Sequence, residues 1–290
     1  MRNLPKITKL ANSICKHCQL GKQTRASFRT KEHSTSKPLE LVHTDLYGPT
    51  RTKSLQGESY FMLFIDDFTR MCWVTFLKEK LEAFQKFKAF KILVVNEIGE
   101  KLKCLRSDNG GEFTSGEFNL FCKNHGIKRQ FSAARTPQQN GVAERRNRNV
   151  QEAARTMLSE AKLFDGYWRE AISTTIYILN RGQLRVNSKK TPYELWYGRT
   201  PSVKYFKVFG SKCYINNLNG DLGKFDARSD EGIFLGYASN KKAYRCYNLR
   251  LHKIVESADV KIDDLKTQKI KHQKSTSDSE SEEDEESVSI

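Results

Sequence analysis

The sequence predicts a mixed α/β domain, then a small β-domain, then a polar tail. Strand-like and helix-like apolar patterns alternate between residues 39 and 200. Beyond Pro201 the apolar segments become short and aromatic-rich, and Gly, Asn and Asp turns separate them. After Asp264 the chain is first basic and then a run of Ser, Glu and Asp, a composition that cannot bury a core.

The first part of the chain predicts five strands and five helices. Apolar residues at 84, 87, 90, 94 and 98 give the first helix its 3.6-residue period. The expected strands are 39–46, 60–65, 71–77, 101–106 and 127–131, and the expected helices are 81–98, 115–125, 138–161, 167–181 and 192–197. Three strands, a helix, a strand, a helix, a strand and a long helix are the order of a ribonuclease-H-like mixed five-stranded sheet.

The long helix is expected to begin near Gln138, with a capping box at 136–139 and Pro137 at its first position. Gly141 weakens this start, so the alternative is a loop in place of the first turn. The expected apolar stripe is Val150, Ala154, Met157, Leu158 and Ala161, and the expected polar face is Glu144, Arg148, Gln151 and Arg155. This pattern predicts that Glu144 points outward beside arginines suited to a phosphate backbone.

The second part predicts strands at 208–215, 231–235, 244–248 and 254–260, which together indicate a small β-barrel. The expected domains are an N-terminal segment at 1–36, an α/β domain at 37–200, a β-domain at 201–264 and a tail at 265–290.

The charge of the chain favours a polyanionic partner. The net charge is +16, but the last 16 residues hold seven acids and no Lys or Arg, so residues 1–274 carry +23. Each Lys or Arg placed against a phosphate releases counterions, which favours nucleic acid. A merely soluble basic surface is the alternative.

The cysteines and the apolar runs indicate an intracellular protein. Five of the seven cysteines are scattered, mostly among apolar neighbours, as expected of reduced core thiols. The first nine residues lack the apolar stretch of a signal peptide, and no run of about 18 apolar residues occurs. We therefore expect no membrane span.

Three carboxylates, Asp45, Asp108 and Glu144, are the candidate catalytic residues. Each is predicted at a strand end or near a helix start. Mg²⁺ prefers oxygen ligands, and three acids suffice to hold two ions against a phosphodiester. Asp45 is expected to bind both ions. Asp108 is expected to be the second protein ligand of one ion and Glu144 that of the other, and Glu144 is also expected to orient the attacking water. A single acid of this kind is more often a solvated side chain.

These acids and their neighbours resemble the integrases of retroviruses and long-terminal-repeat retrotransposons, and the local sequence motifs resemble those of the copia type. The 35 residues between Asp108 and Glu144 match the Asp-Asp-Glu triad of those enzymes. The matching motifs in the core are His43-Thr44-Asp45-Leu46-Tyr47-Gly48-Pro49, Ile65-Asp66-Asp67-Phe68-Thr69-Arg70, Ser107-Asp108-Asn109-Gly110-Gly111-Glu112-Phe113, Gln138-Gln139-Asn140-Gly141-Val142-Ala143-Glu144-Arg145 and Thr191-Pro192-Tyr193-Glu194-Leu195-Trp196. Segments 208–214 and 232–237 resemble the SH3-like region that follows the core.

The resemblance implies a Pol polyprotein fragment that acts on double-stranded DNA. It implies hydrolysis near the 3′ end of the element's DNA, then attack of the freed 3′-hydroxyl on target DNA, with two Mg²⁺ or Mn²⁺ ions. It also implies a homo-oligomer and work in the nucleus after synthesis in the cytoplasm. The expected DNA-contact residues are Gln138, Gln139, Asn140, Arg145, Arg148, Gln151 and Arg155. The alternative is a truncated or co-opted transposon remnant that binds nucleic acid without catalysis.

Other acids nearby have plainer interpretations. Asp66 and Asp67 lie between two apolar strands, so a turn is favoured over a fourth metal ligand. Segment 109–111 predicts a tight turn that lets the backbone approach the metal site, with Glu112 structural or facing DNA. Ribonuclease H itself is disfavoured, because the first helix offers no glutamate in a clear register.

Cys15 and Cys18 have the spacing of half a zinc site and resemble the end of the integrase's N-terminal His-His-Cys-Cys module. The two histidines of that module lie upstream of its cysteines, and residues 1–14 contain none. His33 and His43 are the remaining candidates for a Zn²⁺ site. The alternative is a truncated module with free cysteines.

Overall fold

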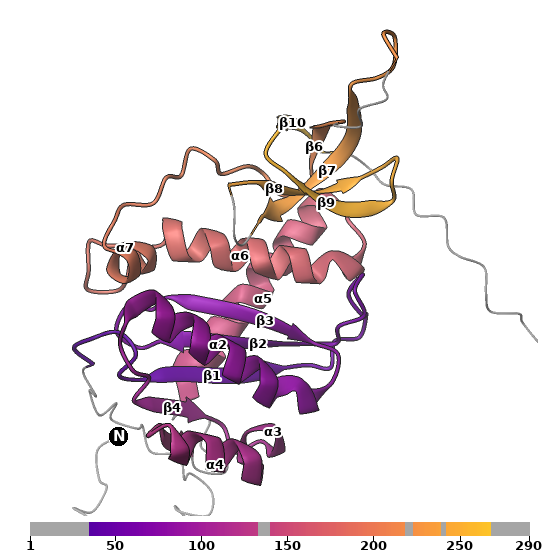
Figure 1. Cartoon of the computed structure of the whole chain (residues 1–290). Helices are drawn as coiled ribbons and strands as arrows, with labels where there is room; N and C mark the ends of the chain where they lie inside the picture. Colours follow the sequence, from indigo (N-terminus) through magenta and orange to yellow (C-terminus); the bar gives the residue numbers. More distant parts are fainter. Residues whose placement is uncertain (1–34, 133–139, 218–222, 239–241, 268–290) are drawn as a thin grey trace, which may run out of the picture. The chain divides into compact units, whose positions relative to one another are not determined.

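The computed structural model describes residues 35–132, 140–217, 223–238 and 242–267. Its first sheet has the strand order β3-β2-β1-β4-β5 (Figure 1). The strands are β1 (Val42–Tyr47), β2 (Tyr60–Asp66), β3 (Cys72–Leu77), β4 (Cys104–Ser107) and β5 (Lys128–Phe131). β1, β2 and β3 pair antiparallel, whereas β4 pairs parallel to both β1 and β5. The predicted ribonuclease-H-like sheet is therefore confirmed.

The predicted helices are present with small shifts of their ends. They are α2 (Ala83–Ile98), preceded by the 3₁₀ turn η1 (Lys80–Glu82), then α4 (Gly116–Asn124), α5 (Gly141–Ala161), α6 (Trp168–Gly182), preceded by η3 (Asp165–Tyr167), and α7 (Pro192–Tyr197). Ser115 caps α4 by accepting a hydrogen bond from the Phe118 amide at 3.3 Å. A short helix, α3 (Gly111–Thr114), begins at the last residue of the tight turn expected at 109–111.

The sheet is covered on both faces, because β2 is apolar at every position from Phe61 to Ile65. Alternate residues of a strand face opposite sides. Met62 and Phe64 pack against Phe87, Phe90 and Phe118 of α2 and α4. The other face meets α5 and α6, and its cluster includes Phe61, Leu63, Ile65, Val150, Ala154, Trp168 and Ile172.

The apolar stripe predicted for the long helix is confirmed, with Val150, Ala154, Leu158 and Ala161 buried and Met157 packed against the same cluster. The helix begins at Gly141. The predicted capping box at 136–139 lies outside the described residues.

The second sheet is antiparallel, with the strand order β10-β6-β7-β8-β9. Its strands are β6 (Ser211–Asn216), β7 (Ser229–Tyr237), β8 (Tyr244–Asn248), β9 (Lys253–Ser257) and β10 (Val260–Thr267). The single strand predicted at 254–260 is wrong. The chain turns where the Asp259 amide donates to Ser257 Oγ at 3.1 Å, and β10 then pairs with β6 at the opposite edge from β9.

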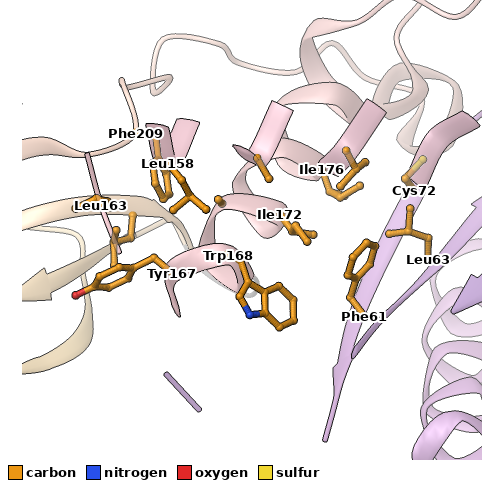
Figure 2. Packing of buried hydrophobic residues seen from close by; sticks show 14 of the residues in the cluster. Phe61, Leu63, Cys72, Leu158, Leu163, Tyr167, Trp168, Ile172, Ile176 and Phe209 are labelled. Atoms are coloured by element: carbon orange, nitrogen blue, oxygen red, sulfur yellow. The ribbon is translucent and has the colours of Figure 1, made fainter. Parts of the chain in front are cut away.

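Helix α6 is shared by the two sheets. Ile172 and Ile176 belong to one buried cluster with Phe61 and Leu63 of β2 (Figure 2). Ile233 and Leu235 of β7 belong to the same cluster.

The contact between α6 and β7 is close. Thr174 Oγ1 donates to the Leu235 carbonyl at 2.9 Å. Gly236 follows with φ +133°, and a side chain there would collide with Thr174, so glycine lets the strand lie directly on the helix.

Asn180 of α6 also satisfies an edge of the first sheet. Its Nδ2 donates to the Cys72 carbonyl at 2.7 Å, and its Oδ1 accepts from the Cys72 amide at 2.9 Å. β3 is an edge strand, whose outer backbone groups need partners when they are buried.

We expect Asn180→Ala to lower the free energy of unfolding by about 3 kcal/mol, because it leaves a buried amide and a buried carbonyl without partners. Urea denaturation followed by circular dichroism measures this. Asn149→Ala, an exposed position on α5, is the control and should change stability by less than about 0.5 kcal/mol. Equal stabilities of the two variants would contradict the assignment.

Candidate active site

The parallel pairing of β1 and β4 brings Asp45 and Asp108 to one level. Val42 lies opposite Leu105, and His43 opposite Arg106. Two residues further, the same register sets Asp45 beside Asp108, which follows the last residue of β4. Side chains at one level of neighbouring parallel strands point to the same face. Both carboxylates therefore point to the face covered by α5, opposite the face of Val42 and Leu105.

Two asparagines hold α5 over this face. Asn140 Nδ2 donates to the Thr44 carbonyl at 3.3 Å, and Asn147 Nδ2 donates to Asp45 Oδ2 at 2.6 Å. Glu144 lies four residues after Asn140 and three before Asn147, so all three share one helix face. Glu144 is half-buried, and its charge is near enough to act on Asp45. Tertiary contacts decide which polar face of the helix is turned inward.

The three carboxylates affect one another's protonation. Burial, then the negative charge of Asp108, raises the pKa of Asp45 to about 7, and the charge of Glu144 adds to this. Burial also raises the pKa of Asp108 and that of Glu144, and the charge of Asp108 raises the latter further. Buried charges of one sign need a counter-charge. Such a site suits a divalent cation.

The donor set fits Mg²⁺ if a substrate phosphate completes the coordination. No three acidic, histidine or thiol side chains within the described ranges lie close enough to hold one ion as they stand. Mg²⁺ is usually bound by one or two carboxylates together with water and substrate phosphates. Asp45 with Asp108, and Asp45 with Glu144, would supply such pairs.

A polar network near Asp45 joins His43 of β1 to the turn that follows β2. His43 Nε2 lies 2.8 Å from Asp67 Oδ1, and its ring is 1% exposed. Burial lowers the pKa of His43, which opposes its protonation. The His43 ring is thus packed in the core, which leaves it out of the zinc site considered with Cys15 and Cys18. Those two cysteines lie outside the described residues.

The acidic pair between β2 and β3 serves the turn. Asp66 accepts hydrogen bonds from the Leu39 amide at 2.8 Å and from the amide and hydroxyl of Thr69 at 2.8 and 2.7 Å. Asp67 pairs with His43 and with Arg70. Burial acts to raise the pKa of Asp67, but its partners hold it at about 2. Both carboxylates are engaged in the fold, as the turn interpretation predicted.

The expected DNA-contact residues differ in position. Arg145, Arg148 and Arg155 are exposed on α5, and Gln151 is half-buried. Asn140 is 2% exposed and holds the helix to β1, so in this structure its side chain serves the fold. Gln138 and Gln139 lie outside the described residues.

Sequence reasoning missed Asn147 and Lys80. Asn147 bonds Asp45 directly, and its spacing of one helical turn from Glu144 was a usable signal. Lys80 precedes α2 and is close enough for its charge to lower the pKa of Asp108. No sequence pattern links it to Asp108, because only the folded sheet brings them together.

Two other expectations concern the whole chain. Cys72, Cys104, Cys122, Cys213 and Cys246 are buried free thiols, as predicted. In the parts of the chain that the structure covers, every helix is too short or too polar to cross a bilayer.

Two family profiles match the chain. The family profile described as "Integrase core domain" matches residues 35–137, and that described as "Retroviral polymerase SH3-like domain" matches residues 211–276.

Two curated relatives are Pol polyproteins of plant transposons. The chain is 41% identical over 246 residues to the retrovirus-related Pol polyprotein from transposon TNT 1-94 of Nicotiana tabacum. It is 31% identical over 250 residues to that from transposon RE2 of Arabidopsis thaliana. The alignments cover 85% and 86% of this chain but only 18% and 17% of the relatives, so the chain spans less than a fifth of their length.

A solved structure shares the fold. A chain of the simian T-cell lymphotropic virus intasome, determined in complex with PP2A regulatory subunit B56 gamma, aligns with a TM-score of 0.51 and 17% identity over 80% of each chain. The catalytic core domain of HTLV-2 integrase in complex with magnesium aligns with 22% identity and a TM-score of 0.42, over 56% of this chain and 98% of that one.

The fold and the matched profiles define the chain as an integrase core domain followed by a retroviral SH3-like domain. The relatives that it resembles are retrotransposon Pol polyproteins, which is consistent with the copia-type integrase that its motifs indicate.

We expect Asp45→Asn to stabilise the metal-free protein at pH 8 by about 2 kcal/mol. The raised pKa of Asp45, about 7, means that the folded state binds this proton more tightly than the unfolded chain. The destabilisation of the fold by the ionised Asp45 carboxylate is therefore absent well below pH 4, grows between about pH 4 and 7, and is complete above pH 7. An amide keeps the bond to Asn147 without the charge.

Thermal unfolding in EDTA measures this, with an expected rise of about 5 °C at pH 8 and little change at pH 4.5. Asp259→Asn, at an exposed carboxylate, is the matched control. A gain in melting temperature that is independent of pH would show that charge repulsion is not the cause.

Proposed function

We propose that this chain is an Asp-Asp-Glu integrase that processes DNA 3′ ends and joins them to target DNA. The observation that carries the proposal is the proximity of Asp45, Asp108 and Glu144, which come from two parallel strands and one helix. The charge of Asp108 raises the pKa of both Asp45 and Glu144. The integrase core profile and the Pol relatives support the same class of reaction.

The carboxylates would hold two Mg²⁺ or Mn²⁺ ions, which supply charge stabilisation and an activated oxygen nucleophile in phosphodiester chemistry. Asp45 would bind both ions, Asp108 would bind one of them and Glu144 the other. Asn147 fixes the orientation of Asp45 by its 2.6 Å bond, and Asn140 fixes the start of α5. The protein's share of catalysis is thus positioning, with no covalent intermediate.

The surface of α5 suits a DNA backbone. Arg145, Arg148 and Arg155 are exposed on the helix that carries Glu144. Arg145 and Arg148 are near enough for their charges to lower the pKa of Glu144. A phosphate bound here would lie beside the carboxylates, and element ends and target DNA are the proposed ligands.

Three further parts of the proposal follow from the family. Assembly as a homo-oligomer and action in the nucleus are proposed on this basis. Zn²⁺ binding by Cys15 and Cys18 is retained as a prediction. The competing function is DNA binding without catalysis, as in a transposon remnant.

We expect the native chain to join strands of a pre-branched DNA substrate with Mn²⁺ or Mg²⁺. Asp108→Asn and Glu144→Gln should each reduce the rate at least a hundredfold, because each removes a charged metal ligand. Glu117→Gln, at an exposed acid of α4, is the control and should keep native activity. Tight DNA binding without joining in any variant would favour the remnant instead.

We expect Arg148→Gln and Arg155→Gln each to lower the slope of log affinity against log salt by about 1, because each removes one phosphate contact. Fluorescence anisotropy with a DNA duplex at several salt concentrations measures the slope. Lys123→Gln on α4 removes the same charge elsewhere. If all three variants changed the slope equally, binding would follow overall charge and not this face.

A further inference from the structure

Arg129 of β5 is a half-buried cation. Within the described ranges, no carboxylate forms an ion pair with it. Its guanidinium carbon lies 4.3 Å from the ring centre of Phe118 and 4.7 Å from that of Phe131. Burial lowers its pKa. Burying a charge in this way is costly, although cation–π contact with two rings offsets part of the cost.

Arg129 Nη1 donates to Cys122 Sγ of α4 at 4.0 Å, and the other two hydrogen bonds of Arg129 go to the loop that carries Asp108. Its Nη2 donates to Ser107 Oγ at 3.3 Å and to the Phe113 carbonyl at 3.0 Å. These acceptors stand at the two ends of the 108–112 loop. Both residues are fully buried, so the ends are fixed in the core.

Inside the loop, the bonds continue to Asp108. Ser107 Oγ donates to the Asp108 carbonyl at 2.8 Å, so this hydroxyl connects Arg129 to the backbone of Asp108. The Phe113 amide donates to the Gly110 carbonyl at 3.0 Å, and the Gly110 amide donates to Asp108 Oδ1 at 3.3 Å. Hydrogen bonds from both ends of the loop therefore lead to Asp108, to its carbonyl from Ser107 and to its carboxylate from Phe113 by way of Gly110.

The side of the sheet is also informative. Arg129 lies opposite Leu105 in the parallel pairing of β4 with β5, and so points to the face of α4. Asp108 points to the face of α5. Arg129 thus acts from beneath the sheet and does not occupy the space where DNA or metal would bind.

We propose that Arg129 is a positioning residue, which clamps both ends of the Asp108 loop and thereby presets that carboxylate for a divalent cation. This rests on the proposed function for the role of Asp108, whereas the clamp itself is a property of the loop. Residues that orient metal ligands typically change metal affinity 10- to 100-fold when they are replaced.

The test uses the full chain with Arg129→Met, Arg129→Lys and Arg181→Met. Methionine fills the space between the rings and removes the buried charge, so it should not lower the melting temperature. Arg181 is the matched control, because it also lies over two rings, Tyr177 at 3.7 Å and Tyr193 at 4.7 Å, and donates to a backbone carbonyl at 3.3 Å.

Two readouts separate positioning from folding. Hydrogen exchange of the Gly110 and Phe113 amides is measured in metal-free protein, and Mn²⁺ affinity is measured without DNA from the electron paramagnetic resonance signal of free Mn²⁺. We expect Arg129→Met to speed exchange and weaken Mn²⁺ binding about tenfold. Arg129→Lys should fall between it and the native chain, because one ammonium cannot reproduce the planar fork. Arg181→Met should leave both readouts unchanged.

Native exchange and native Mn²⁺ affinity in Arg129→Met would overturn the proposal, as would equal effects in Arg181→Met. If Arg129→Met does not fold, native values in Arg129→Lys overturn it and intermediate values support it. A native chain that neither binds Mn²⁺ nor joins DNA would refute the proposed function, while the exchange comparison would still decide whether the clamp exists.

Discussion

The parallel pairing of β1 with β4 is the constraint on which the candidate site depends. It sets Asp45 and Asp108 at one level of the sheet, although 63 positions separate them in the chain. Helix α5, which packs on the face of these carboxylates through its apolar stripe, is also held there by the amides of Asn140 and Asn147, and it carries Glu144. A register shift of one residue would turn Asp108 to the opposite face of the sheet.

The site carries an electrostatic cost that the rest of the domain offsets. Three carboxylates with raised pKa values destabilise a metal-free protein at neutral pH. Opposing this are two apolar clusters, one on each face of the sheet. Helix α6 belongs to the cluster on the α5 face and also packs on β7, so the SH3-like sheet contributes to the same core. Stability and site geometry are therefore linked through the packing on that face.

Asparagine and arginine side chains perform much of the positioning. Asn147 orients Asp45, Asn180 completes the edge of β3, and Arg129 holds the ends of the Asp108 loop. Each makes at least one bond to a residue distant in sequence. The Asn180 amide is buried at modest cost because both of its polar ends find partners, whereas the buried guanidinium of Arg129 lies against aromatic faces as well.

The sequence by itself determined the order of strands and helices of the core, because apolar period and turn residues are local properties. It also determined the candidate triad, because the motifs around Asp45, Asp108 and Glu144 and the spacing between them can be recognised in the sequence alone. Only the tertiary structure decided that Glu144 lies near enough to act on Asp45, that Asn147 bonds Asp45, and that residues 254–260 divide between β9 and β10. These outcomes depend on which distant segment a side chain or strand meets, and a periodic pattern carries no information about that partner.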